Sequence, residues 1–184
     1  MRFRPVLALT TLAVLGVASP LAAAEFPTFG THDIATAFFI SKSDDKNRVD
    51  YGMRLDENCA AVGDDAVFPY WREFEKSPPV RTHALGTFEY VPYGFAMQKN
   101  VKKTPTGGEY AVKLKQFPRP IFLTTKKEEG GRCSVLVRTK IGTTEWAKLE
   151  SIHAKLGGLM SVDYVDVKGK NLATGEAIEE RIQK

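Results

Sequence analysis

The sequence lacks most of the motifs that announce catalytic chemistry. It holds two cysteines and three histidines among 184 residues, and it shows no nucleophile elbow, Walker loop, dinucleotide fingerprint or H-E-x-x-H motif. Its glycine pairs lack the spacing that cradles phosphate on a helix N-terminus. His32, His83 and His153 are too widely separated to indicate a metal site. From its motifs we therefore predict no catalytic residue, no cofactor and no metal.

Long apolar runs are also scarce, and the longest lies at the N-terminus. Residues 5–21 are apolar, follow Arg2 and Arg4, and precede three alanines that end at Ala24. This pattern is typical of a signal peptide spanning residues 1–24, with cleavage between Ala24 and Glu25. An N-terminal membrane anchor is the alternative. We expect an exported protein, periplasmic or extracellular, whose mature chain has no membrane span.

The two cysteines, Cys59 and Cys133, both lie in the predicted mature chain. In an oxidising compartment, such a pair most simply forms one disulfide across a long loop. A reactive thiol or a metal ligand is the alternative, but neither cysteine belongs to a C-x-x-C motif or adjoins a histidine. The sequence therefore predicts a structural disulfide.

Charge is unevenly distributed along the chain. Residues 25–90 carry 7 basic and 12 acidic side chains, residues 91–142 carry 11 and 3, and residues 143–184 carry 6 and 7. A basic central third favours an anionic envelope component or a protein partner, although lysine-bearing strands facing solvent give the same pattern. Nothing in it resembles a nucleic-acid motif, so we expect no nucleic acid partner.

Short alternating runs bounded by turn residues recur throughout residues 25–184, which predicts a single β-rich domain. The clearest is 110–117, where Tyr110, Val112 and Leu114 alternate with Lys113 and Lys115. We expect an antiparallel β-sandwich, Ig-like or related, with at most one or two short helices. The other predicted strands cover 34–41, 48–56, 83–91, 120–125 and 133–141.

Two segments are ambiguous. Residues 146–156 place Trp146, Leu149 and Ile152 near helical spacing, and their composition favours a helix. Residues 161–182 suggest a hairpin that turns at 173–175, but Ile178 and Ile182 in its second arm are four residues apart.

The stretch 67–75, VFPYWREFE, is the best candidate binding segment. Its apolar residues have helical spacing, but Pro69 would remove a backbone donor inside a helix, so we predict a strand. That strand puts Val67, Trp71, Glu73 and Glu75 on one face, and Phe68, Tyr70 and Phe74 on the other. We expect Phe68, Tyr70 and Phe74 in the core. Trp71 is the residue of this stretch for which a functional role stays possible. The candidate ligand-binding residues are Trp71, Tyr70, Glu73 and Glu75.

Three functions remain open at this stage. A non-catalytic binding or envelope-associated module needs Trp71 or Tyr70 partly exposed beside a groove. A hydrolase would use Glu73, Glu75 or Glu89 together with His83, since paired carboxylates serve acid–base chemistry; it needs at least two of these groups in one cleft. A structural domain would pair through an exposed sheet edge.

A series of short motifs also resembles a known family. The motifs are Phe38-Phe39-Ile40, Asn47-x-Val49-x-Tyr51 leading to Leu55-Asp56, Tyr70-Trp71, Leu85-x-x-x-Glu89 with Tyr93-Gly94, and Val162-x-Tyr164-Val165-x-Val167-x-Gly169 with Thr174-Gly175. Together they are similar to domain of unknown function 4833, a group of mostly exported bacterial proteins, over about residues 34–182. The resemblance implies a compact, mostly β domain in which residues 147–154 and the C-terminal arm are strands. It implies no activity.

Overall fold

The computed structural model describes residues 36–42, 46–74, 81–158 and 161–184. One helix, α1, covers Tyr90–Tyr93. The strands are β1 (Thr36–Lys42), β2 (Arg48–Met53), β3 (Val67–Glu73), β4 (Arg81–Ala84), β5 (Phe95–Thr104), β6 (Gly107–Leu114), β7 (Pro120–Lys127), β8 (Cys133–Ile141), β9 (Thr144–Leu156), β10 (Val162–Asn171) and β11 (Ala177–Gln183). The prediction of a mostly β protein is confirmed.

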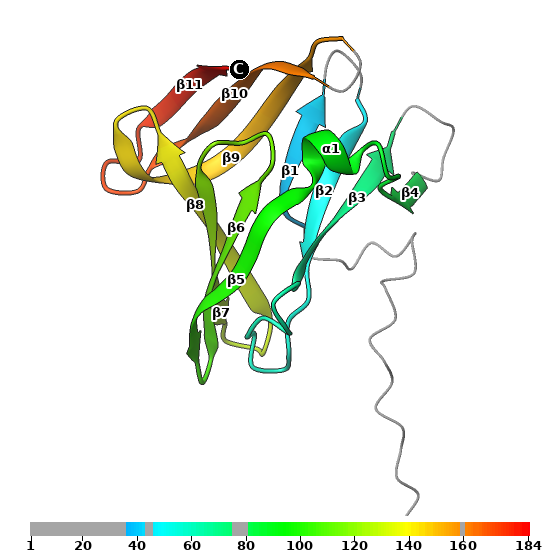
Figure 1. The fold of residues 1–184 in the computed structure, drawn as a ribbon. Helices are drawn as coiled ribbons and strands as arrows, with labels where there is room; N and C mark the ends of the chain where they lie inside the picture. Colours follow the sequence, from blue (N-terminus) through cyan, green and yellow to red (C-terminus); the bar gives the residue numbers. More distant parts are fainter. Residues whose placement is uncertain (1–35, 43–45, 75–80, 159–160) are drawn as a thin grey trace, which may run out of the picture.

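These strands form one continuous, strongly curled sheet (Figure 1). Its order is β4-β3-β2-β1-β9-β8-β7-β6-β5, and β10 and β11 branch from β9. We call β1–β4 the first wing and β5–β8 the second wing. Strand β9 joins the two wings along one of its edges. The first half of that edge pairs with β8, and residues 152–154 further along it pair with β1. The result is an open half-barrel.

This architecture departs from the predicted Ig-like antiparallel sandwich, which is not confirmed. A sandwich stacks two separate sheets, whereas here β9 carries hydrogen bonding from one wing into the other. One pair is also parallel, with Ile40 opposite Ile152 and Lys42 opposite Ala154. Alternating runs reveal which strands exist, but they do not reveal whether a long strand is shared between two neighbours.

The core fills the concave side of the sheet. Tyr110, Val112 and Leu114 are buried, while Lys113 and Lys115 are exposed, as the alternation in 110–117 predicted. Phe38 and Ile40 of β1, and Val49 and Tyr51 of β2, belong to the same apolar cluster. The rings of Phe38 and Tyr51 stack with centroids 4.4 Å apart.

Residues 146–156 are a strand, as the family resemblance implied and against helix propensity. The pairing of β9 with β10 slips between Ser151 and Leu149, which leaves Glu150 as the extra residue of a β-bulge. The bulge shifts the alternation by one residue, so Leu149 and Ile152 are both buried although they lie three apart. A bulged strand therefore imitated helical spacing.

The C-terminal hairpin is also confirmed, with β10 paired to β11 throughout. Its turn contains Gly175 at φ 77°, a conformation that glycine adopts without strain. Residues 178 and 182 lie on one face of a strand as well as on one face of a helix, which explains the ambiguity.

Two predictions along the chain were wrong. The expected strand at 83–91 ends at Ala84, and a turn and α1 follow; the Gly86 N–H is bound by the Glu89 carboxylate at 2.6 Å instead of joining a ladder. Strand β5 was not foreseen, because bulges between Phe95 and Met97 and between Asn100 and Lys102 break its alternation.

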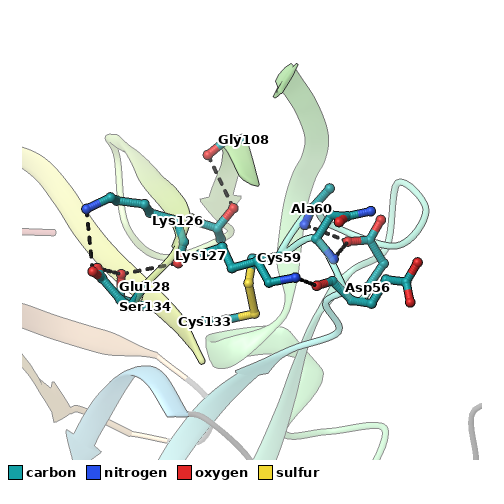
Figure 2. Close-up of a disulfide and its surroundings, with 12 residues drawn as sticks. Asp56, Cys59, Ala60, Gly108, Lys126, Lys127, Glu128, Cys133 and Ser134 are labelled. Carbon is teal, nitrogen blue, oxygen red and sulfur yellow. Dashed lines mark hydrogen bonds and ion pairs between the residues drawn. A yellow bond between two sulfur atoms is a disulfide. The ribbon is translucent and has the colours of Figure 1, made fainter. Parts of the chain in front are cut away.

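The disulfide between Cys59 and Cys133 links the two wings (Figure 2). Cys59 lies in the loop that follows β2, and Cys133 begins β8. The loop is tightly wound, because the Asp56 carboxylate accepts the backbone N–H groups of Asn58 and Ala60, both at 2.9 Å. Lys127 adds a second link by donating to the carbonyl of Glu57 at 2.9 Å.

No helix in the described part of the chain combines the length and apolarity needed to cross a membrane.

Candidate functional site

Strand β3 separates the predicted binding residues onto two faces. Trp71 faces the core cluster and is 4% exposed. Tyr70, 1% exposed, lies on the opposite face, where its hydroxyl is 2.9 Å from that of Thr36 and accepts a hydrogen bond from Arg72. Neither ring is the partly exposed platform that a surface-binding module requires. Phe68 is buried as expected, whereas Phe74, expected in the core, is 38% exposed just beyond the strand end.

A small polar cavity of about 80 Å³ lies beside Trp71. It is lined by Lys42, Asn47, Trp71, Glu73, His83 and Glu89. We call it the Trp71 cavity. Its residues come from the ends of β1 and β3, from β4 and from the turn before α1, which lie at one end of the half-barrel (Figure 1). The cavity thus unites residues that are far apart in the sequence.

The acidic and basic groups of the cavity lie close together. Glu73 Oε1 is 3.5 Å from His83 Nε2. His83 Nδ1 is 3.0 Å from the carbonyl of Ala84, and because a carbonyl only accepts, the proton resides on Nδ1. Nε2 is the ring nitrogen that faces Glu73. Lys42 places its ammonium 4.6 Å from the centre of the Trp71 ring.

The indole N–H of Trp71 is the unusual group in this cavity. It is buried and has no hydrogen-bond partner in the described part of the chain. A buried donor left unpaired costs about 1–3 kcal/mol. The ring itself is well held, edge-on to Tyr93 at 5.6 Å between centroids and tilted against His83 at 6.5 Å. The ring thus lines the polar cavity, while its N–H is enclosed and unsatisfied among the described residues.

Sequence reasoning found four of the six lining residues: Trp71, Glu73, His83 and Glu89. It missed Lys42 and Asn47, which flank the turn between β1 and β2. Asn47 belongs to one of the motifs that resemble the family, but that motif pointed to a strand and not to a site. Glu75 lies outside the described residues, as do Ala24 and Glu25 at the predicted cleavage point. Tyr70 does not line this cavity.

The basic central third does not form one uninterrupted cationic surface. Arg119 pairs with Glu180, Arg138 with Glu109 and Lys126 with Glu128. Lysines 99, 102 and 103 of β5, in contrast, make no ion pair with any described residue. The excess of positive charge is therefore concentrated along β5 and its neighbourhood.

Among the described residues, no group of three or more histidine, cysteine, aspartate or glutamate side chains is arranged to hold a metal ion.

Comparison with known proteins identifies the family. A family model described as domain of unknown function (DUF4833) matches residues 38–181. The chain belongs to this family. The DUF4833 match includes at least part of every described strand, and it includes both cysteines, so the disulfide and the Trp71 cavity lie inside it. A search of curated proteins found no match, and a search of solved structures found none.

Proposed function

We propose that this DUF4833 protein is an exported, non-catalytic binding protein, and that its ligand inserts a small polar group into the Trp71 cavity. The observation that carries the proposal is the buried, unpartnered indole N–H of Trp71 beside a cavity lined by polar side chains. The candidate leader at residues 1–24 supports export. So does the disulfide, because such bonds persist in oxidising compartments.

The size of the cavity limits what enters it. A volume of about 80 Å³ is well below that of sites that enclose whole drug-sized molecules. The cavity therefore accepts the end of a larger molecule.

The cavity's chemistry points to hydroxyl groups. Lys42 and the Trp71 N–H are donors, whereas Glu73 and Glu89 are acceptors. A hydroxyl both donates and accepts, so it fits such a mixed lining. An anionic group would instead be repelled by the two carboxylates. We therefore expect the ligand at this cavity to be a neutral polyhydroxylated chain end, such as that of an envelope glycan.

The proposal is tested by measuring binding of the protein to an array of neutral and acidic glycans. The glycan that binds best is then titrated. Trp71→Phe keeps an aromatic ring, although a smaller one, and removes the N–H. It should weaken binding by about tenfold, the value of one hydrogen bond. Trp146→Phe is the matched control and should leave affinity unchanged. The proposal fails if no glycan binds, or if Trp71→Phe binds as tightly as the wild type.

A second candidate function is acid–base catalysis. Its geometric requirement is met, because Glu73, His83 and Glu89 line one cavity and two of them are 3.5 Å apart. Turnover of a panel of nitrophenyl glycosides and esters tests it, with Glu73→Gln and Glu89→Gln as knock-outs. A wild-type activity that is lost in both variants would establish an enzyme. If the wild type turns over none of these substrates, this candidate is removed.

Assembly through a sheet edge receives less support. The path of described strands ends at β4 and β5, and β11, which pairs with β10 alone, is a further edge. Strand β4 has four residues, and β5 exposes three lysines, which is a common way of blocking edge-to-edge pairing.

A further inference from the structure

A second and larger cavity lies between the two wings. It has a volume of about 250 Å³ and is separate from the Trp71 cavity. It is lined by Val67, Phe68, Pro69, Tyr70, Ala84, Tyr90 and Phe95, with Arg54, Asp65 and Gln98 as its polar members. We call it the wing cavity.

The topology explains why this space exists. Strand β4 pairs with β3 only from Tyr70 to Glu73. The first half of β3, Val67–Pro69, therefore has β2 on one side and no described strand on the other. Pro69 suits this position, since it has no N–H to offer a neighbouring strand. The start of β5 lies across the gap without pairing to β3.

The walls of the wing cavity are fastened at both ends. At one end, the Tyr51 hydroxyl donates to the carbonyl of Tyr93 at 2.8 Å, which holds α1 against β2. At the other, Asn100 donates to the carbonyl of Gly63 at 2.9 Å, and Tyr110 donates to the carbonyl of Asp64. Because the walls are tied, the space does not close by a simple shift of one strand. The cavity is preformed.

Its lining combines an apolar body with one polar end. The aromatic residues Phe68, Tyr70 and Phe95 line the apolar part, together with Val67 and Pro69. At the polar end, Arg54 holds Asp65 by a contact of 3.5 Å, and the Asp65 side chain is 82% exposed. Gln98 Oε1 lies 3.1 Å from the Tyr110 hydroxyl, and it shares the one hydroxyl proton with the carbonyl of Asp64.

We propose that the wing cavity binds an anionic amphiphile, with the apolar chain among the aromatic rings and the acidic head against Arg54. An engineered cavity of about 150 Å³ accepts benzene, so this one has room for a chain of about ten carbon atoms. Arg54 also donates to the backbone carbonyl of Asp65 at 3.4 Å and lies 5.2 Å over the ring of Phe68. A ligand carboxylate or phosphate would therefore replace only the exposed Asp65 carboxylate, a contact that solvent screens. The lysines of β5 add positive charge along the same edge.

Calorimetric titration of the purified protein with decanoate, below its micelle concentration, tests the inference. We expect saturable binding of one decanoate, and no comparable binding of decyltrimethylammonium, which has the same chain and the opposite charge. Failure of decanoate to bind, or equal binding of the cationic amphiphile, would overturn the proposal.

Two pairs of variants locate the site. Ala84 is exposed and lines the cavity, so Ala84→Trp should obstruct the mouth and abolish binding without disturbing the core; Ala96→Trp on exposed β5 is the matched control. Arg54→Gln should weaken decanoate binding by about tenfold. Asp65→Asn should strengthen it, because it removes the competing carboxylate. Unchanged binding in Ala84→Trp or in Arg54→Gln would contradict the assignment.

The two sites are tested independently. Trp71→Phe should leave decanoate binding unchanged, and Arg54→Gln should leave glycan binding unchanged. Thermal unfolding of each variant shows whether a loss of binding reflects loss of the fold.

Discussion

The two wings of the half-barrel bury their charges differently. In the first wing, Asp50 is fully buried, 2.6 Å from Arg48 Nε. Arg72 Nε lies 2.9 Å from the other carboxylate oxygen of Asp50. This contact is an ion pair that lacks hydrogen-bond geometry. In the second wing, Glu109 pairs with Arg138, and both side chains keep contact with water at 30% and 19% exposure. The same residue types are thus structural in one wing and solvated in the other.

The two tryptophans differ in the same way. Trp71 of the first wing is buried. Trp146, in the half of β9 that pairs with the second wing, is 47% exposed, with the Arg138 guanidinium 4.8 Å above its ring and Phe122 edge-on at 5.4 Å. The comparison teaches that the first wing encloses Asp50 and Trp71, whereas Glu109 and Trp146 keep contact with water.

The disulfide that joins the wings should produce the largest change. Replacing Cys59 and Cys133 together by alanine removes a cross-link over 74 residues, which should lower the free energy of unfolding by about 4 kcal/mol. Urea unfolding of the oxidised protein against the double variant measures it. Equal unfolding midpoints would show that the wings hold together without the bond.

Removing the buried carboxylate should come next. Asp50→Ala leaves Arg48 and Arg72 without their shared partner and should cost about 3 kcal/mol, the low end for a broken buried pair, because both arginines are partly solvated. Glu109→Ala in the second wing is the comparison and should cost no more than about 1 kcal/mol. Similar losses in the two variants would break the contrast between the wings.

The tryptophans offer a smaller and more local test. Trp71→Phe should destabilise the protein by about 1–2 kcal/mol through lost packing, and Trp146→Phe by no more than about 0.5 kcal/mol. Because the chain has two tryptophans, each variant also leaves one reporter. Acrylamide should quench Trp146 in Trp71→Phe far more strongly than Trp71 in Trp146→Phe. The opposite ranking would contradict the burial of Trp71.

The smallest expected effect is the pH dependence from Glu180. The hydrogen bond from Arg119 holds the pKa of this carboxyl below its ordinary value of 4.5, helped by the Gly142 N–H and opposed by partial burial. A lowered pKa stabilises the fold above pH 4.5, and the stabilisation disappears as pH falls through the folded-state pKa. Glu180→Gln should therefore be less stable at pH 7, by no more than about 1 kcal/mol.

Thermal unfolding between pH 7 and pH 3 measures this difference. It should narrow below pH 4.5, because Glu180 of the wild type then becomes protonated. A constant difference across the whole range would show that the pair does not act through ionisation.

Local patterns predicted most of the strands, because a strand with one face in the core alternates regardless of its neighbours. Residues 110–117 and 133–141 are clear examples. Prediction failed where pairing was irregular: the bulges of β5 hid a strand, and the bulge at Glu150 gave β9 a helical appearance. A bulge depends on the partner strand, so a single stretch of sequence does not reveal it.

The candidate site was predictable in part for the same reason. Alternation placed Trp71 and Glu73 on one face of a strand, and they do line one cavity. Lys42, Asn47 and Glu89 reach that cavity only because β1, β3 and the turn before α1 end side by side. No sequence pattern predicted the wing cavity, because the cavity arises where β4 pairs with only part of β3.

The sequence by itself determined the β content, the pairing of Cys59 with Cys133, and the inward and outward faces of the regular strands, because these follow from local alternation and from having two cysteines. Tertiary structure decided the open half-barrel, the burial of Trp71 and the exposure of Trp146. Those properties depend on how β9 is shared between the wings and on how strongly the sheet curls, and both are set by contacts between residues that are distant in the sequence.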